Sequence, residues 1–596
     1  MTPPFTTRPD IRGTFGVVTS THWIASAVGF GVLERGGNAF DAAVATGFAL
    51  QIVEPHLNGP GGELPVLFHE AASGRTAVLC AQGIVPQAAT IARFRELGLD
   101  MVPGSGLLPT VVPGSFDGWM LLLREYGTIT VREALAAAID LARDGHPVMP
   151  RVANTLAGLA DFFATDWPTS GATWMPDGTA PAAHELLANP ETAAMYARIV
   201  EEAERAGPDR VAQIEAARTA WREGFVADTM FAYLDTASVP DMTGRSHGAL
   251  LTRDDVAQWR ATIESPVSGT YHGWTVHKTA PWSQGPVLLQ ALAILEHIDI
   301  AGMDPDGAVF VHTVTEAIKL AFADRETFYG DPAFCEVPLA RLLDPEHNRA
   351  RAALIAETAS LEQRPSRLPG FEHLADAFVE RAARDSAPDI SPLEPTMAHL
   401  TERRGDTVHL DVIDRWGNVV SATPSGGWFQ SSPSIPGLGF SLNTRAQMFW
   451  LEEGLPTSLM PGARPRTTLT PTIAEKDGIR LALGTPGGDQ QDQWQLIAFL
   501  RHVHHGMSLQ ANLDAPLFHS MHVQGSFYPR AAKAGELTLE ASFGAEVIDE
   551  LTRRGHRVTV VDEWSVGRLT AAERRADGRL CAAASPRLMQ AYAVGR

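Results

Sequence analysis

The chain has 596 residues, with 45% hydrophobic and 20% charged residues, and its formal net charge is -21. Such an acidic balance excludes a nucleic-acid-binding surface, which would need clustered lysine and arginine. At roughly 150 residues per domain, length alone would suggest about four domains, but that prior is soft. The three cysteines, Cys80, Cys335 and Cys581, show no CxxC spacing. Neither a zinc site nor a disulfide framework is therefore predicted.

The sequence carries no visible targeting or membrane segment. Its first residues lack the apolar core of a signal peptide. No run of about 18 apolar residues occurs, so no membrane-spanning helix is predicted. The scarcity of cysteine fits a reducing compartment. We therefore expect a cytoplasmic protein with neither membrane nor nucleic-acid partners.

The first 60 residues alternate strand-like and helical patterns. Residues 16–20 (GVVTS) predict a buried strand. Residues 35–38 predict a turn, and Asn38 is placed to cap a helix running through 41–44. A glycine-rich loop follows at 58–62.

From about 130 to 350 helical patterns dominate. Residues 132–143 place apolar side chains at helical spacing, and Gly145 stands where a C-cap belongs. Residues 317–325 predict another helix. Proline, serine and charged residues then dominate the ends of 350–406, which we interpret as an exposed, mobile connector.

The pattern changes immediately after this connector. Residues 407–414 predict a strand, 415–418 a turn and 419–423 a return strand. Thr407 therefore stands at the start of a predicted core strand, at the end of the connector.

This position matters because an N-terminal threonine carries its own base. The α-amine, with a reference pKa of about 7.7–8.0, can accept the hydroxyl proton directly or through one water. The bond between Asp406 and Thr407 must first be cut, and the same hydroxyl can do this by attacking the Asp406 carbonyl. The products would be a large chain, 1–406, and a small chain, 407–596. Taken alone, however, a threonine at a strand start is more often a residue that simply favours strands.

A second feature raises the weight of this hypothesis. Residues 481–488 (LALGTPGG) predict a strand that runs into a glycine turn and opens a helix over 489–500. Consecutive backbone N–H groups at a helix start bind anions, and two of them can hold the oxyanion of a tetrahedral intermediate. An ordinary glycine-rich turn is the alternative, and for this stretch alone it is the better account.

Together these stretches resemble the γ-glutamyltransferase family of N-terminal-nucleophile (Ntn) hydrolases. The similarity extends from about residue 14 to 594 and is carried by an ordered series of motifs. These are RGGNAFDAA (35–43), VPG (112–114), SPVSGTYHG (265–273), AFADR (321–325), GDP (330–332), DTVH (406–409), DRWGN (414–418), LTPT (469–472) and GTPGG (484–488).

The resemblance implies a four-layer αββα sandwich of the α/β class, with additional helices from the large chain. It implies self-cleavage at Thr407, Ser425 beside Thr407 as an activating or positioning group, and Gly487 and Gly488 as oxyanion donors. Two further positions, Thr467 and Thr468, would present paired hydroxyls to a substrate carboxylate. No metal or organic cofactor is expected. The two chains should associate as one intertwined domain, and a homodimer of such heterodimers stays an open alternative.

The sequence departs from the family where the γ-glutamyl group is recognised. Gln82 stands where the family has an arginine for the α-carboxylate, and Met448 stands where it has an acid for the α-amine. Gly427 replaces a helping asparagine, and Arg445 replaces a neighbouring amide. A glutamine amide does not replace a bidentate arginine at similar strength, and an unpaired buried ammonium is costly.

These changes predict poor binding of γ-glutamyl donors. Arg445 could instead anchor an acyl group that bears a carboxylate but no free amine. In the alternative, the alignment slips by a residue or two and Arg445 is structural.

Two further motifs suggest other chemistries. Residues 244–248 fit the G-x-S-x-G serine-hydrolase pattern but lack a convincing strand before them, so chance is the better account. His502, His504 and His505 could suggest a metal, but histidines at a helix end more often interact favourably with the helix dipole. No H-E-x-x-H motif occurs.

The sequence therefore predicts an autoprocessing amide hydrolase or acyltransferase that acts on a small-molecule amide, with hydrolysis favoured. A true γ-glutamyltransferase or glutathione hydrolase is one alternative. A non-catalytic, unprocessed binding protein is the other.

Overall fold

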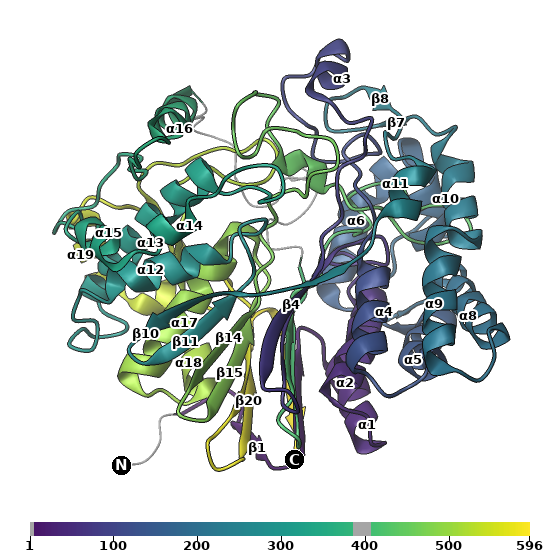
Figure 1. Cartoon of the computed structure of the whole chain (residues 1–596), viewed down its shortest axis with the longest axis horizontal. Coiled ribbons are helices and arrows are strands. Elements are labelled where there is room, and N and C mark those ends of the chain that lie inside the picture. Colours follow the sequence, from purple (N-terminus) through teal and green to yellow (C-terminus); the bar gives the residue numbers. More distant parts are fainter. Residues whose placement is uncertain (1–4, 385–406, 590) are drawn as a thin grey trace.

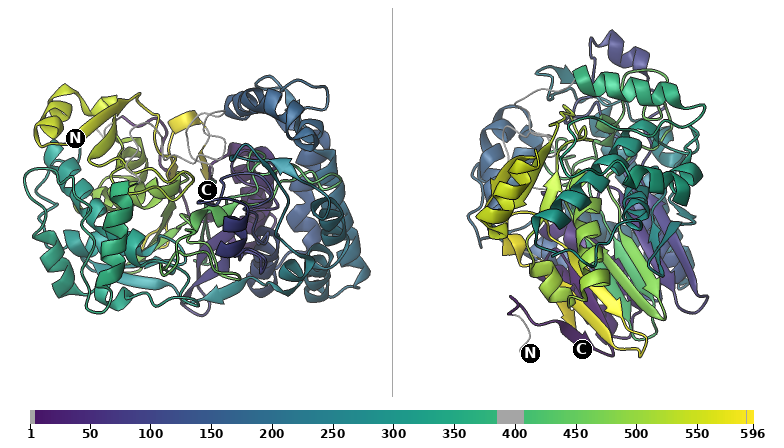
Figure 2. Two further views of the ribbon diagram at one scale, coloured as in Figure 1. Left: turned by 90° about the horizontal axis from the view of Figure 1, so that it is seen from above. Right: turned by 90° about the vertical axis from the view of Figure 1, so that its left-hand side faces the viewer.

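The computed structural model describes residues 5–384, 407–589 and 591–596. Two seven-stranded antiparallel sheets are stacked face to face, and helices cover both outer faces (Figure 1). Each sheet thus buries one face against the other sheet and one against helices. This arrangement confirms the expected four-layer αββα sandwich, and the left-hand view of Figure 2 shows the same layers from above.

The strand order of each sheet mixes distant parts of the sequence. The first sheet runs β1 (Ile11–Gly13), β20 (Leu580–Ala584), β19 (Thr570–Arg574), β15 (Ile479–Gly484), β14 (Thr472–Lys476), β11 (Trp274–Lys278) and β10 (Val267–Tyr271). The second runs β21 (Tyr592–Gly595), β2 (Gly16–Ser20), β12 (Leu410–Asp414), β13 (Val419–Ala422), β3 (Leu64–Glu70), β4 (Arg75–Ala81) and β9 (Thr262–Glu264). Each sheet combines strands from both sides of position 407, so neither proposed chain could form a complete sheet without the other.

The space between the sheets is filled by apolar side chains from their inner faces. Val17, Leu67 and Ile413 of the second sheet meet Ile473 and Ala572 of the first, and all five are fully buried. Outward-facing residues of the same strands pack against the helices. Because successive strand residues point to opposite faces, strands buried on both sides contain near-continuous apolar runs.

The helices form two groups, one on each outer face (Figure 1). The second sheet is covered by α1 (Trp23–Glu34), α2 (Ala39–Val53), α4 (Ser115–Tyr126), α5 (Val131–Asp144), α8 (Pro190–Arg205), α9 (Arg210–Arg222) and α10 (Phe225–Leu234). The first is covered by α12 (Pro286–Leu295), α13 (Ala308–Phe328) and α17 (Gln491–His505).

The other helices and strands stand outside these two groups and the two large sheets. The helices are α3 (Ile91–Glu96), α6 (Pro150–Thr165), α7 (Pro168–Trp174), α11 (Arg253–Gln258), α14 (Leu339–Leu342), α15 (Pro345–Ala352), α16 (Glu372–Arg384), α18 (Leu509–Asp514) and α19 (Ala545–Arg553). The strands are β5 (His146–Pro147), β6 (Leu186–Leu187), β7 (Val239–Pro240), β8 (Ser246–His247), β16 (Phe518–Ser520), β17 (Glu536–Glu540) and β18 (Arg557–Val561).

Several local predictions are confirmed. Asn38 forms a capping box at the start of α2, Gly145 ends α5 with φ 82°, and residues 317–325 lie inside α13. The strand predicted at 16–20 is β2. The helix predicted over 489–500 begins as a short 3₁₀ turn at Gly488–Gln490 and continues as α17.

The connector prediction needs correction over its described part. Within this stretch α16 is not an exposed tether, because it buries Ala375, Phe378 and Ala382. Its charged pattern is that of an amphipathic helix with one apolar face. The remaining connector, 385–406, lies outside the described residues.

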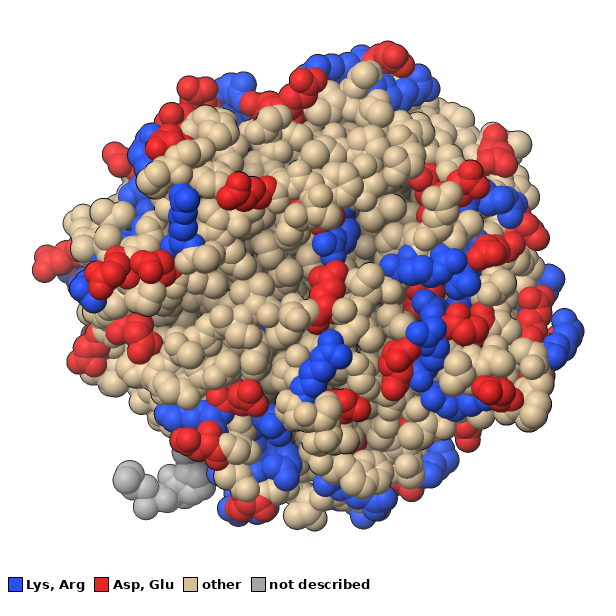
Figure 3. Space-filling view, in the orientation of Figure 1, with Lys and Arg blue, Asp and Glu red and all other residues tan. Residues whose placement is uncertain are grey.

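Charge on the face shown in Figure 3 is mixed, with lysine and arginine interspersed among aspartate and glutamate. No helix in the described ranges is long and apolar enough to cross a membrane.

Candidate active site

Thr407 is fully buried at the entry to β12. The hairpin of β12 and β13 places it opposite Ser425, with which it forms an isolated antiparallel bridge. Thr407 Oγ1 and Ser425 Oγ lie 3.2 Å apart. The predicted nucleophile and its predicted partner are therefore brought together, 18 residues apart in sequence. The other side of the predicted cleavage site, Asp406, lies outside the described residues.

Arg445 reaches this pair from a short 3₁₀ helix at Arg445–Met448. Its Nη2 donates to Ser425 Oγ at 2.8 Å, and its Nε donates to Glu63. Asn443 Nδ2 also donates to Glu63, at 2.9 Å, and Asn443 Oδ1 accepts from the Arg445 backbone N–H. No local sequence pattern points to Glu63, because its partner Arg445 stands 382 residues further along the chain.

Two buried donors beside Ser425 make no hydrogen bond among the described residues. They are Arg445 Nη1 and Trp428 Nε1. The Arg445 guanidinium lies between the rings of Trp428 and Phe527, with its carbon 5.3 and 5.1 Å from their centroids. Buried donors normally have acceptors. These two atoms could therefore donate to an acceptor-rich ligand group.

The glycine turn after β15 has the backbone that only glycine adopts readily. Gly487 has φ 126° and Gly488 has φ 56°. A Cβ on Gly487 would lie 2.2 Å from the Trp494 ring, so no side chain fits. Gln284 Nε2 donates to the Gly488 carbonyl at 3.3 Å, which fixes the far end of the turn.

This turn is held next to the strand of Thr407. A Cβ on Gly484 would lie 2.1 Å from the His409 ring, so the two strands approach closely at this point. Arg568 makes a second link, because its backbone N–H donates to Thr485 Oγ1 at 3.2 Å and its Nη2 donates to the Thr407 carbonyl at 3.4 Å. The sequence offered no sign that Arg568 belongs to the site.

The remaining predicted binding residues are buried but less directly connected. Gln82 ends the β4 segment, and its Nε2 donates to Gly83 O at 3.4 Å. The backbone of Thr467 forms an isolated parallel β-bridge with Ser283, and both Thr467 and its neighbour Thr468 are fully buried. Among the described residues, Gln82, Thr467 and Thr468 make no hydrogen bond to Thr407.

Gly427 occupies a position where a side chain cannot be placed. A Cβ there would lie 2.7 Å from Gly62 N, and φ is 65°. An asparagine at this position would need a different backbone, so this departure is built into the local packing.

The G-x-S-x-G pattern does not form a nucleophile elbow. Ser246 is exposed in the two-residue strand β8, which pairs with β7, and the next helix, α11, begins only at Arg253. A nucleophile elbow requires a helix directly after the serine. The chance interpretation therefore holds.

Two of the three histidines at the end of α17 have polar protein partners. His502 Nε2 lies 3.1 Å from Glu573, and His504 Nε2 lies 2.7 Å from the Tyr271 hydroxyl. These pairings account for both rings without a metal.

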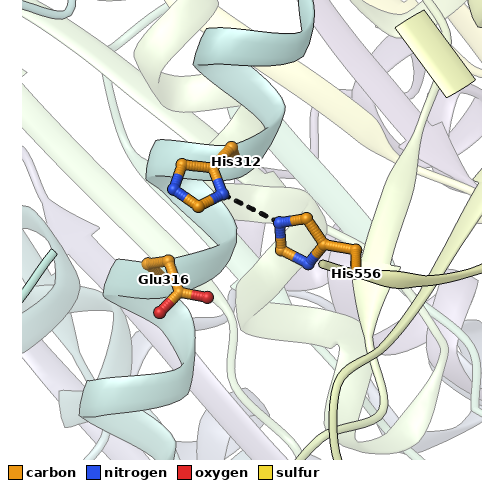
Figure 4. Close-up of side chains that lie close together, drawn as sticks. All are labelled: His312, Glu316 and His556. Atoms are coloured by element: carbon orange, nitrogen blue, oxygen red, sulfur yellow. Dashed lines mark hydrogen bonds between the residues drawn. The ribbon is translucent and has the colours of Figure 1, made fainter. Parts of the chain in front are cut away.

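Within the described residues, one other group has ligand atoms close enough to share a metal ion: His312, Glu316 and His556 (Figure 4). The two rings hydrogen-bond each other at 2.9 Å. Glu316 accepts from Lys319 at 2.5 Å and from Arg364 at 2.6 Å. Since two cations already neutralise the single carboxylate, a divalent ion would meet like charge here. The contacts describe a buried ion-pair network that joins α13 to the segment before β18.

The four-layer fold, with two stacked antiparallel sheets between helices, is that of an Ntn-type hydrolase. The chain belongs to the gamma-glutamyltranspeptidase family, whose model matches residues 25–595. The acylase ACY 1 proenzyme of Pseudomonas sp. (strain SE83) is 32% identical, over 96% of this chain and 92% of the relative. The solved structure of LmbA2991HD is 49% identical with a TM-score of 0.91, covering 100% of both chains. Cephalosporin acylase from Bacillus halodurans is 26% identical with a TM-score of 0.81, covering 100% of this chain and 98% of the relative.

Further relatives are glutathione hydrolase and oxamate amidohydrolase proenzymes. The protein is accordingly an enzyme of the autoprocessed amide hydrolase and acyltransferase class.

Proposed function

We propose that Thr407 is the nucleophile and that the precursor cuts itself between Asp406 and Thr407. The observation that carries the proposal is the buried Thr407–Ser425 hydroxyl pair, 3.2 Å apart, at the start of a core strand. Cleavage gives a large chain, 1–406, and a small chain, 407–596, and their strands share both sheets, which keeps them in one domain.

In the mature enzyme the freed α-amine of Thr407 takes the hydroxyl proton while Oγ1 attacks the substrate carbonyl carbon. The Gly487 and Gly488 N–H groups stabilise the oxyanion. The carbon–nitrogen bond then breaks, the proton passes to the leaving amine, and an acyl ester remains on Thr407. Water then hydrolyses this ester, which releases the carboxylic acid and regenerates the threonine hydroxyl. Ser425 positions Oγ1 throughout.

The substrate we favour is an amide whose acyl group bears a carboxylate. Arg445 Nη1 and Trp428 Nε1 are the donors available to it, since Glu63 already occupies Arg445 Nε. Gln82, Thr467 and Thr468 complete the acyl pocket in this proposal. The names of the relatives, cephalosporin acylase and oxamate amidohydrolase, agree with acyl groups other than γ-glutamyl.

The alternative substrate is a γ-glutamyl amide, as the name glutathione hydrolase of other relatives suggests. Such a donor brings an ammonium that needs a carboxylate partner. Glu63 is fully buried and already bonded to Arg445 and Asn443, and Met448 occupies the position where the sequence comparison expects an acid. Hydrolysis of a non-γ-glutamyl amide is therefore favoured.

A denaturing gel tests the nucleophile. Wild type should run as two bands that sum to 64.1 kDa, and Thr407→Ala should give one band. Mass spectrometry of the small chain should find Thr407 at its N-terminus. A wild type that stays a single band would overturn the proposal and leave the non-catalytic binding protein as the explanation.

Substrate class is tested separately on processed enzyme. Oxamate, glutaryl amides and γ-glutamyl amides are assayed with and without a dipeptide acceptor. Turnover of the first two classes, unaffected by acceptor, is expected. Robust γ-glutamyl turnover would contradict the substrate proposal and leave the nucleophile in place.

A further inference from the structure

Arg568 is a buried cation in contact with the main chain of the proposed nucleophile. Its side chain is 3% exposed, and its Nη2 donates to the Thr407 carbonyl at 3.4 Å. Its backbone N–H holds Thr485 at the start of the oxyanion turn. One residue therefore fixes the nucleophile and the turn relative to each other.

The counter-charge of Arg568 comes from the large chain. Glu54, the C-cap of α2, is fully buried with its Oε1 3.8 Å from Arg568 Nη1. Its other oxygen accepts from the Thr21 hydroxyl. Burial raises the pKa of the Glu54 carboxyl, and Arg568 acts in the opposite direction. The pair thus joins the two proposed chains beside the residue that would be cut free.

Other charged and titratable groups also surround Thr407. They are His409 and Asp411 on its own strand, Arg445 and Glu63 behind Ser425, and Arg151, His22 and His56 around Glu54 and Arg568. Burial, Arg151 and Arg568 all lower the pKa of His56. His409 and Asp411 bond each other at 3.0 Å, and Arg445 pairs with Glu63. Arg568 is the cation that touches Thr407 itself.

We propose that Arg568 is a positioning residue for the reaction: it holds Thr407 by its carbonyl and keeps the freed α-amine in the unprotonated form that accepts the hydroxyl proton. The inference rests on the proposed function. An unperturbed α-amine, with a pKa of about 7.7–8.0, is mostly protonated at pH 7, so only a minor fraction of it is in the form that acts as a base. A cation a few ångströms away disfavours the ammonium. Glu54 limits the effect and keeps the guanidinium stable inside the protein.

Removing the charge of Arg568 or of Glu54 should shift the pKa of the Thr407 α-amine in a defined direction. Without the Arg568 charge, the ammonium form is less disfavoured, so its pKa rises. Without the Glu54 charge, the field of Arg568 is less compensated, so the α-amine pKa falls. At the effective dielectric of a protein site, a charge at this distance shifts a neighbouring pKa by about one unit.

The experiment measures kcat/KM against pH for wild type, Arg568→Gln, Arg568→Lys and Glu54→Gln, after a gel has confirmed processing. The acid limb of the profile is the pH range in which kcat/KM falls because the α-amine becomes protonated. This limb should move to higher pH by about one unit in Arg568→Gln and stay near its wild-type position in Arg568→Lys. In Glu54→Gln it should move to lower pH. The matched control is Arg218→Gln, since Arg218 is a buried arginine paired with Asp117 at 2.7 Å. It should lower thermal stability and leave the acid limb in place.

The outcomes separate the two proposals. An unprocessed wild type overturns the proposed function. Processed, active variants whose acid limbs do not move overturn only the role of Arg568. If Arg568→Gln is not processed while Arg218→Gln is, the result supports a positioning role in self-cleavage, and Glu54→Gln then decides the effect on the amine.

Discussion

The two halves of the candidate site were built by different kinds of contact. The nucleophile half, Thr407 with the Gly487–Gly488 turn, rests on local backbone: a hairpin and a glycine turn that need few partners. The substrate half rests on charged groups from distant segments, of which Arg445 and Glu63 are the centre. The geometry proposed for the reaction therefore depends on local backbone, whereas the charges proposed to select a substrate depend on contacts between distant segments.

The largest effect is expected from a substitution in the nucleophile half of the site. Gly487→Ala places a methyl group 2.2 Å from the Trp494 ring at φ 126°, so the turn must move. We expect kcat to fall about 10²–10³-fold, the usual cost of losing an oxyanion donor. The measurement is steady-state kinetics on processed enzyme.

The matched control is Gly506→Ala, at a left-handed glycine that ends α17 with nothing within 4 Å of the added methyl. It should cost about 1 kcal/mol of stability and leave kcat unchanged. Equal losses of kcat in both variants would show that the Gly487 turn has no special role.

The second prediction concerns a substitution in the substrate half of the site. Arg445→Met removes the proposed anchor and leaves Glu63 buried without its cation, which should cost about 3–5 kcal/mol of stability. KM for a carboxylate-bearing amide should rise about 10–100-fold, the value of a charged hydrogen bond. Thermal melts and KM measurements separate the two effects.

The double variant Arg445→Met with Glu63→Gln should recover much of the stability but not the affinity. A processed double variant with wild-type KM would instead assign Arg445 a purely structural role.

The third prediction concerns the stability of the first sheet's helical layer, where His519 packs edge-on against Trp494. Burial lowers the pKa of His519 from 6.5 to about 3. Below pH 6.5 the unfolded chain binds a proton that the folded protein does not, so stability is lost as the pH falls from 6.5 towards 3.

Because of this histidine, the free energy of unfolding should fall by about 2 kcal/mol between pH 7 and pH 5. His519→Gln should flatten the dependence of the free energy of unfolding on pH in that window, as measured by denaturant titration. An unchanged slope would mean that His519 is not the proton acceptor on unfolding.

The smallest expected effect concerns a residue that belongs to neither half. Ser246→Ala should leave processing, kcat and KM at wild-type values, because Ser246 lies exposed in a two-residue strand. Loss of activity in this variant would revive the serine-hydrolase hypothesis and weaken the assignment to Thr407.

Local patterns predicted the elements that carry the nucleophile. The β12–β13 hairpin, the Asn38 cap and the turn before α17 follow from strand alternation, turn residues and capping, which act over a few positions. The connector was misjudged at α16, because its apolar stripe is short and its charges dominate the composition. Glu54, Glu63 and Arg568 could not be found, since single charged residues give no periodic signal.

The sequence by itself predicted which threonine would react, which glycines shape the turn, and that the residues expected to anchor a γ-glutamyl group are replaced. Only the tertiary structure decided that Arg445 pairs with Glu63 and reaches Ser425, and that Arg568 holds Thr407. The physical reason is distance along the chain. Residues separated by hundreds of positions meet only when the two sheets stack and the helices close over them, and a buried charge then takes whichever partner the packing offers.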